Sequence, residues 1–192
     1  MKVLLLSPEP SHLTETIMGS GCEVVPLNEK FDIFYLEWKK IDFIVSYRYR
    51  HIIGKPIIDW VKGKAVNLHI SLLPWNRGAD PNLWSFLQDT PKGVTIHYID
   101  EGIDTGDIIA QEECHFDMEN NTLATTYKKL NLRILSLFES WCSRILEGKA
   151  PRIRQKSEGT YHKSSDKNRY LHLLSEKGWD TPVKALIGKA NG

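Results

Sequence analysis

The 192-residue sequence has few cysteines, and its three, Cys22, Cys114 and Cys142, lie far apart. An odd number without a Cys-x-x-Cys pair or a cluster of Cys and His fits neither a disulfide framework nor a structural zinc site. The sequence also lacks a signal-peptide-like apolar run after Met1 and any stretch long enough to span a bilayer. We therefore expect a cytoplasmic protein that holds no metal and binds no membrane.

Neither sign of charge is in excess. The 25 basic and 24 acidic side chains give a formal net charge of +1. The chain as a whole therefore lacks the positive electrostatic potential that attracts nucleic acid. Residues 151–192 differ, with nine Lys or Arg against four Asp or Glu. This segment either holds phosphate groups or forms a solvated surface arm that packs through its larger apolar side chains. These are Tyr161, Tyr170, Leu171, Leu173, Leu174 and Trp179.

A glycine-rich loop of the form G-x-G-x-x-G is missing after the first apolar run, where Ser7-Pro8-Glu9-Pro10-Ser11 stands instead. This absence argues against a dinucleotide cofactor. Short apolar runs nevertheless alternate with helical patterns, which is typical of an α/β fold with a mostly parallel sheet flanked by helices. We expect one domain over residues 1–150 and a short extension over 151–192 packed on it.

The pattern predicts the bounds of most elements. The expected strands cover 2–6, 23–27, 41–47, 65–71, 93–100 and 108–116. The expected helices cover 11–19 with Ser11 as cap, 56–62, 81–87, and a long segment that is capped by Asn121 or Thr122 and ends before Gly148. Residues 31–40 are either a helix or irregular.

Two polar side chains, Asn67 and His69, interrupt the apolar strand at 65–71. Residues two apart on a strand point to the same face, so an amide and an imidazole should stand side by side where the strand ends. A later loop with two glycines, Gly102 and Gly106, carries the carboxylate of Asp104. A lone buried His or Asn is more often a hydrogen-bonded core residue than a catalyst, and for His97 in the strand 93–100 we favour that interpretation.

An amide, an imidazole and a carboxylate together can serve acyl transfer to an amine, which is the reaction implied by the family resemblance described in the next paragraph. The carbonyl oxygen becomes negative in the tetrahedral intermediate, and Asn67 and a protonated His69 can donate hydrogen bonds to it. Asp104 would keep the imidazole protonated and help to take up the proton that leaves the amine.

The order of four motifs is informative as well. Asn-Leu-His-Ile-Ser-Leu-Leu-Pro, Trp-Asn-Arg-Gly, Gly-Val-Thr-Ile-His and Ile-Asp-Thr-Gly-Asp follow one another between residues 67 and 107. This series resembles the formyltransferases that use 10-formyltetrahydrofolate. The resemblance covers about residues 2–148 and implies a Rossmann-like formyltransferase fold, 10-formyltetrahydrofolate as formyl donor and no metal.

The resemblance also implies roles for individual residues. It assigns His69 as proton donor, Asn67 as transition-state stabiliser and Asp104 as the group that tunes the histidine. It further implies that two segments approach the pterin end of the folate: His51, Ile52 and Ile53, and the loop of Asp100, Glu101, Gly102 and Ile103.

Two departures and one likeness indicate which branch of the family is most similar. The glycine-rich phosphate loop of glycinamide ribonucleotide formyltransferases is absent, and 42 residues after Ala150 are too few for the extra domain of methionyl-tRNA formyltransferases. The run from Ser46 to Ile53 looks like the amino-sugar branch. We therefore predict a small-molecule substrate, the primary amine of a nucleotide-linked amino deoxysugar, with Arg77 as a candidate for its phosphates. An interpretation of equal weight is that Arg77 shapes its own loop through a hydrogen bond. The sequence leaves open whether the protein forms a homodimer.

Other functions fit parts of the same pattern. A formyltetrahydrofolate hydrolase would use the same three residues with water as acceptor and would release formate. Glycinamide ribonucleotide and methionyl-tRNA formyltransferases stay as alternatives, and a folate-binding module without catalysis is the non-enzymatic one.

Overall fold

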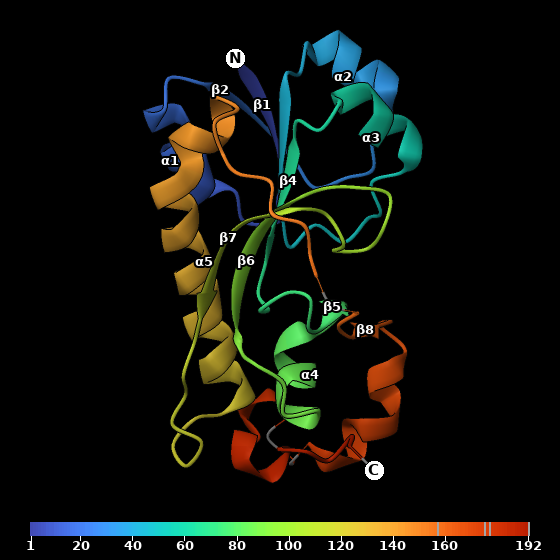
Figure 1. The fold of residues 1–192 in the computed structure, drawn as a ribbon, viewed down its shortest axis with the longest axis vertical. Helices are drawn as coiled ribbons and strands as arrows, with labels where there is room; N and C mark the ends of the chain where they lie inside the picture. The colour runs from blue at the N-terminus through green and yellow to red at the C-terminus, as the bar shows by residue number, and fades with distance from the viewer. Residues whose placement is uncertain (157, 175, 177, 192) are drawn as a thin grey trace.

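The fold is that of a computed structural model, which describes residues 1–156, 158–174, 176 and 178–191. A six-stranded sheet with the strand order β2-β1-β3-β4-β6-β7 runs through the molecule, and helices pack on both of its faces (Figure 1). The strands are β1 (Lys2–Leu6), β2 (Glu23–Leu27), β3 (Phe43–Tyr47), β4 (Ala65–His69), β6 (Gly93–Tyr98) and β7 (Ile108–Glu113). The α/β class predicted from the sequence is confirmed.

The sheet is parallel over its first four strands and antiparallel beyond them. β2, β1, β3 and β4 pair in parallel, whereas β6 runs against both β4 and β7. Alternate residues of one strand serve two cores: Val3 and Leu5 pack in one apolar cluster, and Leu4 and Leu6 pack in the other. Strands that are buried on both faces read as continuous apolar runs, which is why the sequence located them well.

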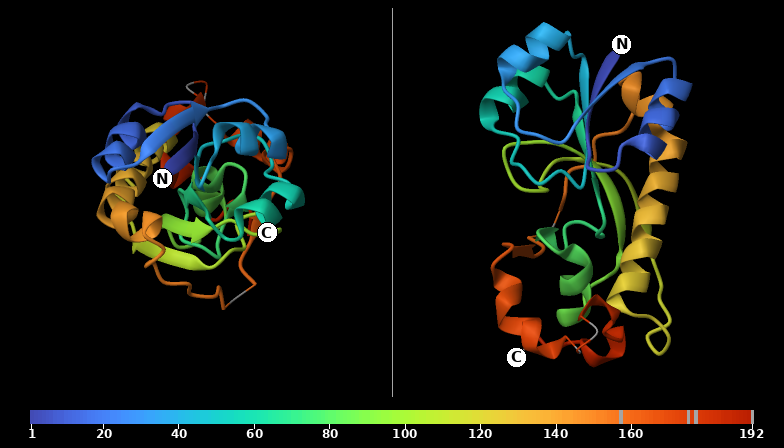
Figure 2. Two further views of the ribbon diagram at one scale, coloured as in Figure 1. Left: turned by 90° about the horizontal axis from the view of Figure 1, so that it is seen from above. Right: turned by 180° about the vertical axis from the view of Figure 1, so that it is seen from behind.

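Helices α1 (Ser11–Gly19) and α5 (Leu123–Leu146) cover one face of the sheet, and α2 (Ile33–Lys39) and α3 (Lys55–Val61) cover the other, as Figure 2 shows from above. The prediction that Ser11 caps α1 is wrong. Pro10 occupies the cap position without a side-chain hydrogen bond, and Ser11 is the first helical residue.

The expected cap of α5 is confirmed. Thr122 Oγ1 accepts a hydrogen bond from the backbone N–H of Thr125, and Thr125 Oγ1 accepts one from the backbone N–H of Thr122. This reciprocal capping satisfies two donors that a helix start otherwise leaves unpaired. Past the other end, Gly148 adopts a positive φ of 70°, a conformation that glycine takes without steric cost.

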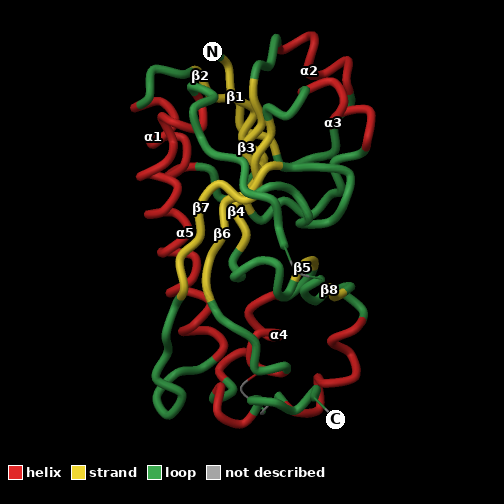
Figure 3. Tube along the Cα trace, in the orientation of Figure 1, coloured by secondary structure: helices red, strands yellow, loops and turns green. Residues whose placement is uncertain are grey.

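The chain after α5 forms a small second layer with the residues that follow β4. In Figure 3 this part consists mainly of loops and short helices. Its two short strands, β5 (Arg77–Gly78) and β8 (Tyr161–His162), pair in parallel. Around them lie α4 (Pro81–Leu87) and three 3-10 helices: η1 (Asp166–Leu173), η2 (Gly178–Asp180) and η3 (Val183–Ala185).

The anchors of this C-terminal part differ from the expected ones. Val183 and Leu186 are fully buried in a cluster with the apolar residues of α4. In the interpretation of the segment as a surface arm Tyr161, Leu171 and Trp179 would pack, but each is more than 40% exposed. Tyr170, Leu173 and Leu174 are partly buried against the same cluster, as expected.

None of the helices in the described ranges has the length and apolarity required to cross a membrane. Nor do the described residues contain a group of three or more His, Cys, Asp or Glu side chains able to hold a metal ion.

Candidate active site

Strand β4 places Asn67 and His69 on one face of the sheet, side by side. Their neighbours Val66 and Leu68 point to the opposite face, into the cluster shared with α1 and α5. His69 is buried and Asn67 is partly buried. The alternation of the strand therefore brings the two polar groups together, as the sequence predicted.

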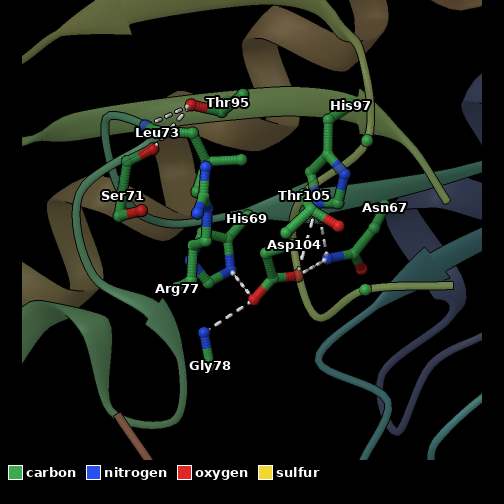
Figure 4. Close-up of polar contacts among 12 residues, drawn as sticks. Asn67, His69, Ser71, Leu73, Arg77, Gly78, Thr95, His97, Asp104 and Thr105 are labelled. Atoms are coloured by element: carbon green, nitrogen blue, oxygen red, sulfur yellow. Dashed lines mark hydrogen bonds and ion pairs between the residues drawn. The ribbon is translucent and has the colours of Figure 1, made fainter. Parts of the chain in front are cut away.

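The loop between β6 and β7 brings Asp104 to these side chains (Figure 4). Its Oδ1 accepts a hydrogen bond from Asn67 Nδ2 at 3.3 Å, and its Oδ2 lies 3.7 Å from His69 Nδ1. The backbone N–H of Gly78 donates to the same Oδ2 at 2.8 Å. All three catalytic residues predicted from the sequence therefore lie in one cluster.

The environment of Asp104 keeps its carboxylate charged. Burial raises the pKa of Asp104, but the charge of His69, the hydrogen bond and charge of His97 and the N–H of Gly78 together outweigh it. The net effect holds the pKa of this carboxyl well below its usual range. The cluster consequently offers a fixed negative charge beside the His69 ring at neutral pH.

The two nitrogens of His69 have different partners. Nε2 lies 3.0 Å from the backbone carbonyl oxygen of Asn76, which can only accept a hydrogen bond. Nε2 therefore carries a proton. Nδ1 faces Asp104 at a distance longer than a normal hydrogen bond, so Nδ1 is the ring atom left to act on a substrate.

His97 belongs to the cluster, although the sequence favoured a structural role for it. The expected hydrogen bond is present, since His97 Nδ1 lies 2.8 Å from the carbonyl oxygen of Tyr98. Its Nε2 also lies 3.4 Å from Asp104 Oδ1 and 3.2 Å from Asn67 Nδ2. The antiparallel pairing that puts His97 opposite Asn67 was the available signal, but the pattern of elements predicted a mostly parallel sheet.

The loop after β4 is held by one threonine of β6. Thr95 Oγ1 donates to the carbonyl of Ser71 at 2.7 Å and accepts from the N–H of Leu73 at 3.1 Å, as drawn in Figure 4. Thr95 is fully buried. It therefore fixes the path of the loop toward Asn76 and Gly78, two further site residues from the Trp-Asn-Arg-Gly motif to which the sequence assigned no role.

The two segments expected to approach the folate meet at one end of the sheet. Glu101 forms an ion pair with Lys55, at the start of α3 and just after His51, Ile52 and Ile53. Asp100 accepts hydrogen bonds from Gly102 and Thr105 within its own loop.

Each of these two segments also has an exposed apolar side chain: Ile52 is 83% exposed and Ile103 is 42% exposed. Exposed apolar side chains on neighbouring loops suit an aromatic ligand, and their contact with folate stays a prediction.

Arg77 is engaged within the protein. Its Nε and Nη2 donate to Gln155 Oε1 at 3.2 and 2.6 Å, and its Nη1 donates to the carbonyl of Glu158 at 2.9 Å. This arrangement favours the loop-shaping interpretation. The role of Arg77 in binding phosphate stays a prediction that no contact supports.

A cavity of about 460 Å³ lies at the end of β3, between the loop after β1 and α5. Basic and aromatic side chains line part of it, including Arg48, Lys128, His12, Tyr47 and Tyr127. Ser46, two residues before Arg48, is the strand partner of Asn67. The cavity and the polar cluster thus lie at the same ends of neighbouring strands, where open α/β sheets bind ligands.

The fold and the cluster define a class of protein, and comparison with known sequences identifies it. Residues 20–135 match the family described as formyl transferase. This match covers more than half of the chain, which therefore belongs to the formyltransferase family and has its Rossmann-like fold.

Two comparisons are more specific. The chain is 52% identical to the formyltransferase PseJ from Anoxybacillus kamchatkensis, which was crystallised with UDP-4,6-dideoxy-4-formamido-L-AltNAc and tetrahydrofolate; the TM-score is 0.94 and the match covers 99% of this chain and 100% of that one. It is 25% identical to a 4-N formyltransferase from Francisella tularensis, with a TM-score of 0.76 over 96% of this chain and 85% of that one.

Curated relatives are longer than this chain. A methionyl-tRNA formyltransferase from Agathobacter rectalis is 33% identical over 78% of this chain and 49% of its own length. A cytosolic 10-formyltetrahydrofolate dehydrogenase from Xenopus tropicalis is 34% identical over 86% of this chain and 18% of its own length. The chain thus spans half or less of these two relatives.

Proposed function

We propose that this chain transfers a formyl group from 10-formyltetrahydrofolate to the primary amine of a nucleotide-linked amino deoxysugar. The observation that carries the proposal is the placement of the Asp104 carboxylate between the amide of Asn67 and the imidazole of His69. The similarity to PseJ, whose crystals held a UDP-linked formamido sugar and tetrahydrofolate, supports the choice of donor and acceptor.

In the proposed reaction the amine nitrogen attacks the formyl carbon and the carbonyl oxygen takes up the negative charge. His69 Nδ1–H and an N–H of Asn67 stabilise this oxygen by hydrogen bonds, which act mainly in the transition state. The amine loses a proton as the new C–N bond forms, and Asp104 helps to accept it. The bond between the formyl carbon and the folate nitrogen then breaks, and that nitrogen takes up a proton as tetrahydrofolate leaves.

The cavity beside Arg48 and Lys128 is part of the proposal as the place for the acceptor's phosphates. Arginine and lysine are the side chains that most often bind phosphate. UDP should therefore compete with the acceptor, and Arg48→Gln should weaken this competition several-fold without changing the affinity for a folate analogue. Inhibition by UDP of equal strength in both proteins would place the phosphates elsewhere.

The test of the function is an assay with 10-formyltetrahydrofolate and a panel of UDP- and dTDP-linked amino deoxysugars. Release of tetrahydrofolate and a gain of one formyl group in the sugar, measured by mass spectrometry, are the expected result. Release of formate without any amine would identify a hydrolase instead. Binding of a folate analogue without turnover on any acceptor, including glycinamide ribonucleotide and methionyl-tRNA, would identify the protein as a folate-binding module without catalysis.

Location and assembly complete the proposal. A cytoplasmic location is supported by three free cysteines. That the protein forms a homodimer stays a prediction. Analytical ultracentrifugation measures its oligomeric state directly.

A further inference from the structure

Gln155 lies in the segment that follows α5 and crosses back toward β5, drawn in orange in Figure 1. Its side chain is partly buried and bridges two parts of the candidate site. Gln155 Nε2 donates to the carbonyl of Asp104 at 2.9 Å and to the carbonyl of Gly106 at 2.8 Å. On its other side, Oε1 accepts both hydrogen bonds from Arg77 described above.

The chemistry of these partners fixes the orientation of the amide. A guanidinium can only donate hydrogen bonds, and a backbone carbonyl can only accept them. Gln155 must therefore turn its oxygen toward Arg77 and its NH₂ group toward the Asp104 loop. No other side chain of this length offers an acceptor on one side and two donors on the other.

The Asp104 loop has a particular need for such a support. Asp104 adopts a positive φ of 54°, a left-handed conformation that costs more for a residue with a side chain than for glycine, although aspartate tolerates it better than most. Most of the loop from Glu101 to Thr105 is exposed, so little packing holds it in place. The two carbonyls that Gln155 binds lie on either side of Thr105, at the point where the chain turns into β7.

We propose that Gln155 is a positioning residue, which holds the main chain of Asp104 so that its carboxylate stays between Asn67 and His69. The segment after residue 150 would then complete the catalytic centre, in addition to covering α4. This inference rests on the proposed formyl transfer, because its main readout is the turnover of that reaction.

Two variants separate positioning from a merely structural link to Arg77. Gln155→Leu removes both sets of hydrogen bonds. Gln155→Glu keeps a partner for Arg77, and strengthens it by adding a charge, but turns a carboxylate oxygen toward the carbonyls of Asp104 and Gly106. Because small displacements of a catalytic group cost up to about a hundredfold in rate, we expect both variants to lose about tenfold to a hundredfold in kcat.

The matched control is Gln88→Glu, which makes the same chemical change at a side chain whose oxygen accepts from His162. We expect kcat within about twofold of wild type there. The spectroscopic readout is the set of imidazole signals of His69 and His97 in NMR spectra. These signals should move in Gln155→Glu and stay in place in Gln88→Glu, since a displaced carboxylate changes the field at both rings.

Wild-type turnover and unmoved imidazole signals in Gln155→Glu would overturn the inference, because a structural link to Arg77 predicts rescue by glutamate. The Glu variant also guards against a folding defect in the Leu variant, since it retains the bond to Arg77. If wild-type protein formylates no acceptor, the proposed function fails, but the imidazole signals still decide whether Gln155 positions Asp104.

Discussion

The polar cluster at the end of β4 and the C-terminal segment beyond residue 150 are held in place differently. In the cluster, buried strands fix Asn67, His69 and His97, and each is hydrogen-bonded or ion-paired to a neighbour. The C-terminal segment has short 3-10 helices and exposed aromatic rings, and it is anchored by Val183 and Leu186. The sheet and the loop between β6 and β7 therefore carry the proposed catalytic groups, whereas the C-terminal segment carries the proposed support.

Replacing His69 by alanine should have the largest effect on the cluster side of this comparison. We expect formyl transfer to be abolished while affinity for a folate analogue stays within about tenfold, since the imidazole acts on charge that appears in the transition state. Steady-state assays and isothermal titration calorimetry measure the two quantities.

His115→Ala is the matched control for this change, because the His115 imidazole is exposed and lies in the loop that follows β7. Its turnover should equal that of wild type. Near-normal turnover in His69→Ala would show that the cluster is not catalytic.

Asp104→Asn should lower activity at neutral pH by about a hundredfold, because the site loses the buried negative charge that faces His69 Nδ1 and the group proposed to accept the proton of the amine. Steady-state measurements of kcat for both proteins at neutral pH check this loss. Near-normal kcat in the variant would show that the charge of Asp104 has no part in catalysis.

The same variant tests the electrostatics through stability. The folded state holds the pKa of Asp104 below its usual value, which is about 3.9 in model peptides. A carboxylate of this kind contributes stability that is present above about pH 4 and is lost as the pH falls toward the folded-state value. The difference in unfolding free energy between wild type and Asp104→Asn should therefore shrink below about pH 4. A difference that does not depend on pH would contradict the assigned charge.

Asn67→Ala should lose about a hundredfold in kcat, the cost of one donor to the oxyanion. Urea unfolding gives the stability of the variant separately. A purely structural asparagine would show instead as lost stability with normal activity per folded molecule.

The sequence predicted the cluster better than the segment, and the reasons are physical. Asn67 and His69 follow from the two-residue period of one strand, and Asp104 from a loop with two glycines. His97 required the antiparallel partner of β4, a long-range pairing that strand periodicity does not reveal. Gln155 stands between basic residues in a segment without periodicity, so nothing local distinguishes it from a solvated side chain.

Element bounds show the same limit. The strand expected over 65–71 ends at His69, because the following loop is bound to Thr95 and leaves the sheet. The strand expected over 108–116 ends at Glu113. The anchors Val183 and Leu186 were overlooked because two apolar residues three apart in a basic tail carry no pattern until α4 packs against them.

Leu186→Ala should have the smallest effect on catalysis, although it affects stability. Leu186 is fully buried against α4, and truncation of such a leucine costs about 2 to 5 kcal/mol through lost burial and a cavity. Leu171→Ala is the control in the same segment, since Leu171 is 43% exposed and surface changes are usually within about 0.5 kcal/mol. Urea unfolding measures both, and activity per folded molecule should be unchanged in both. A loss of kcat in Leu186→Ala at a concentration of urea where the protein is still folded would show that the anchor on α4 also controls the geometry of the cluster.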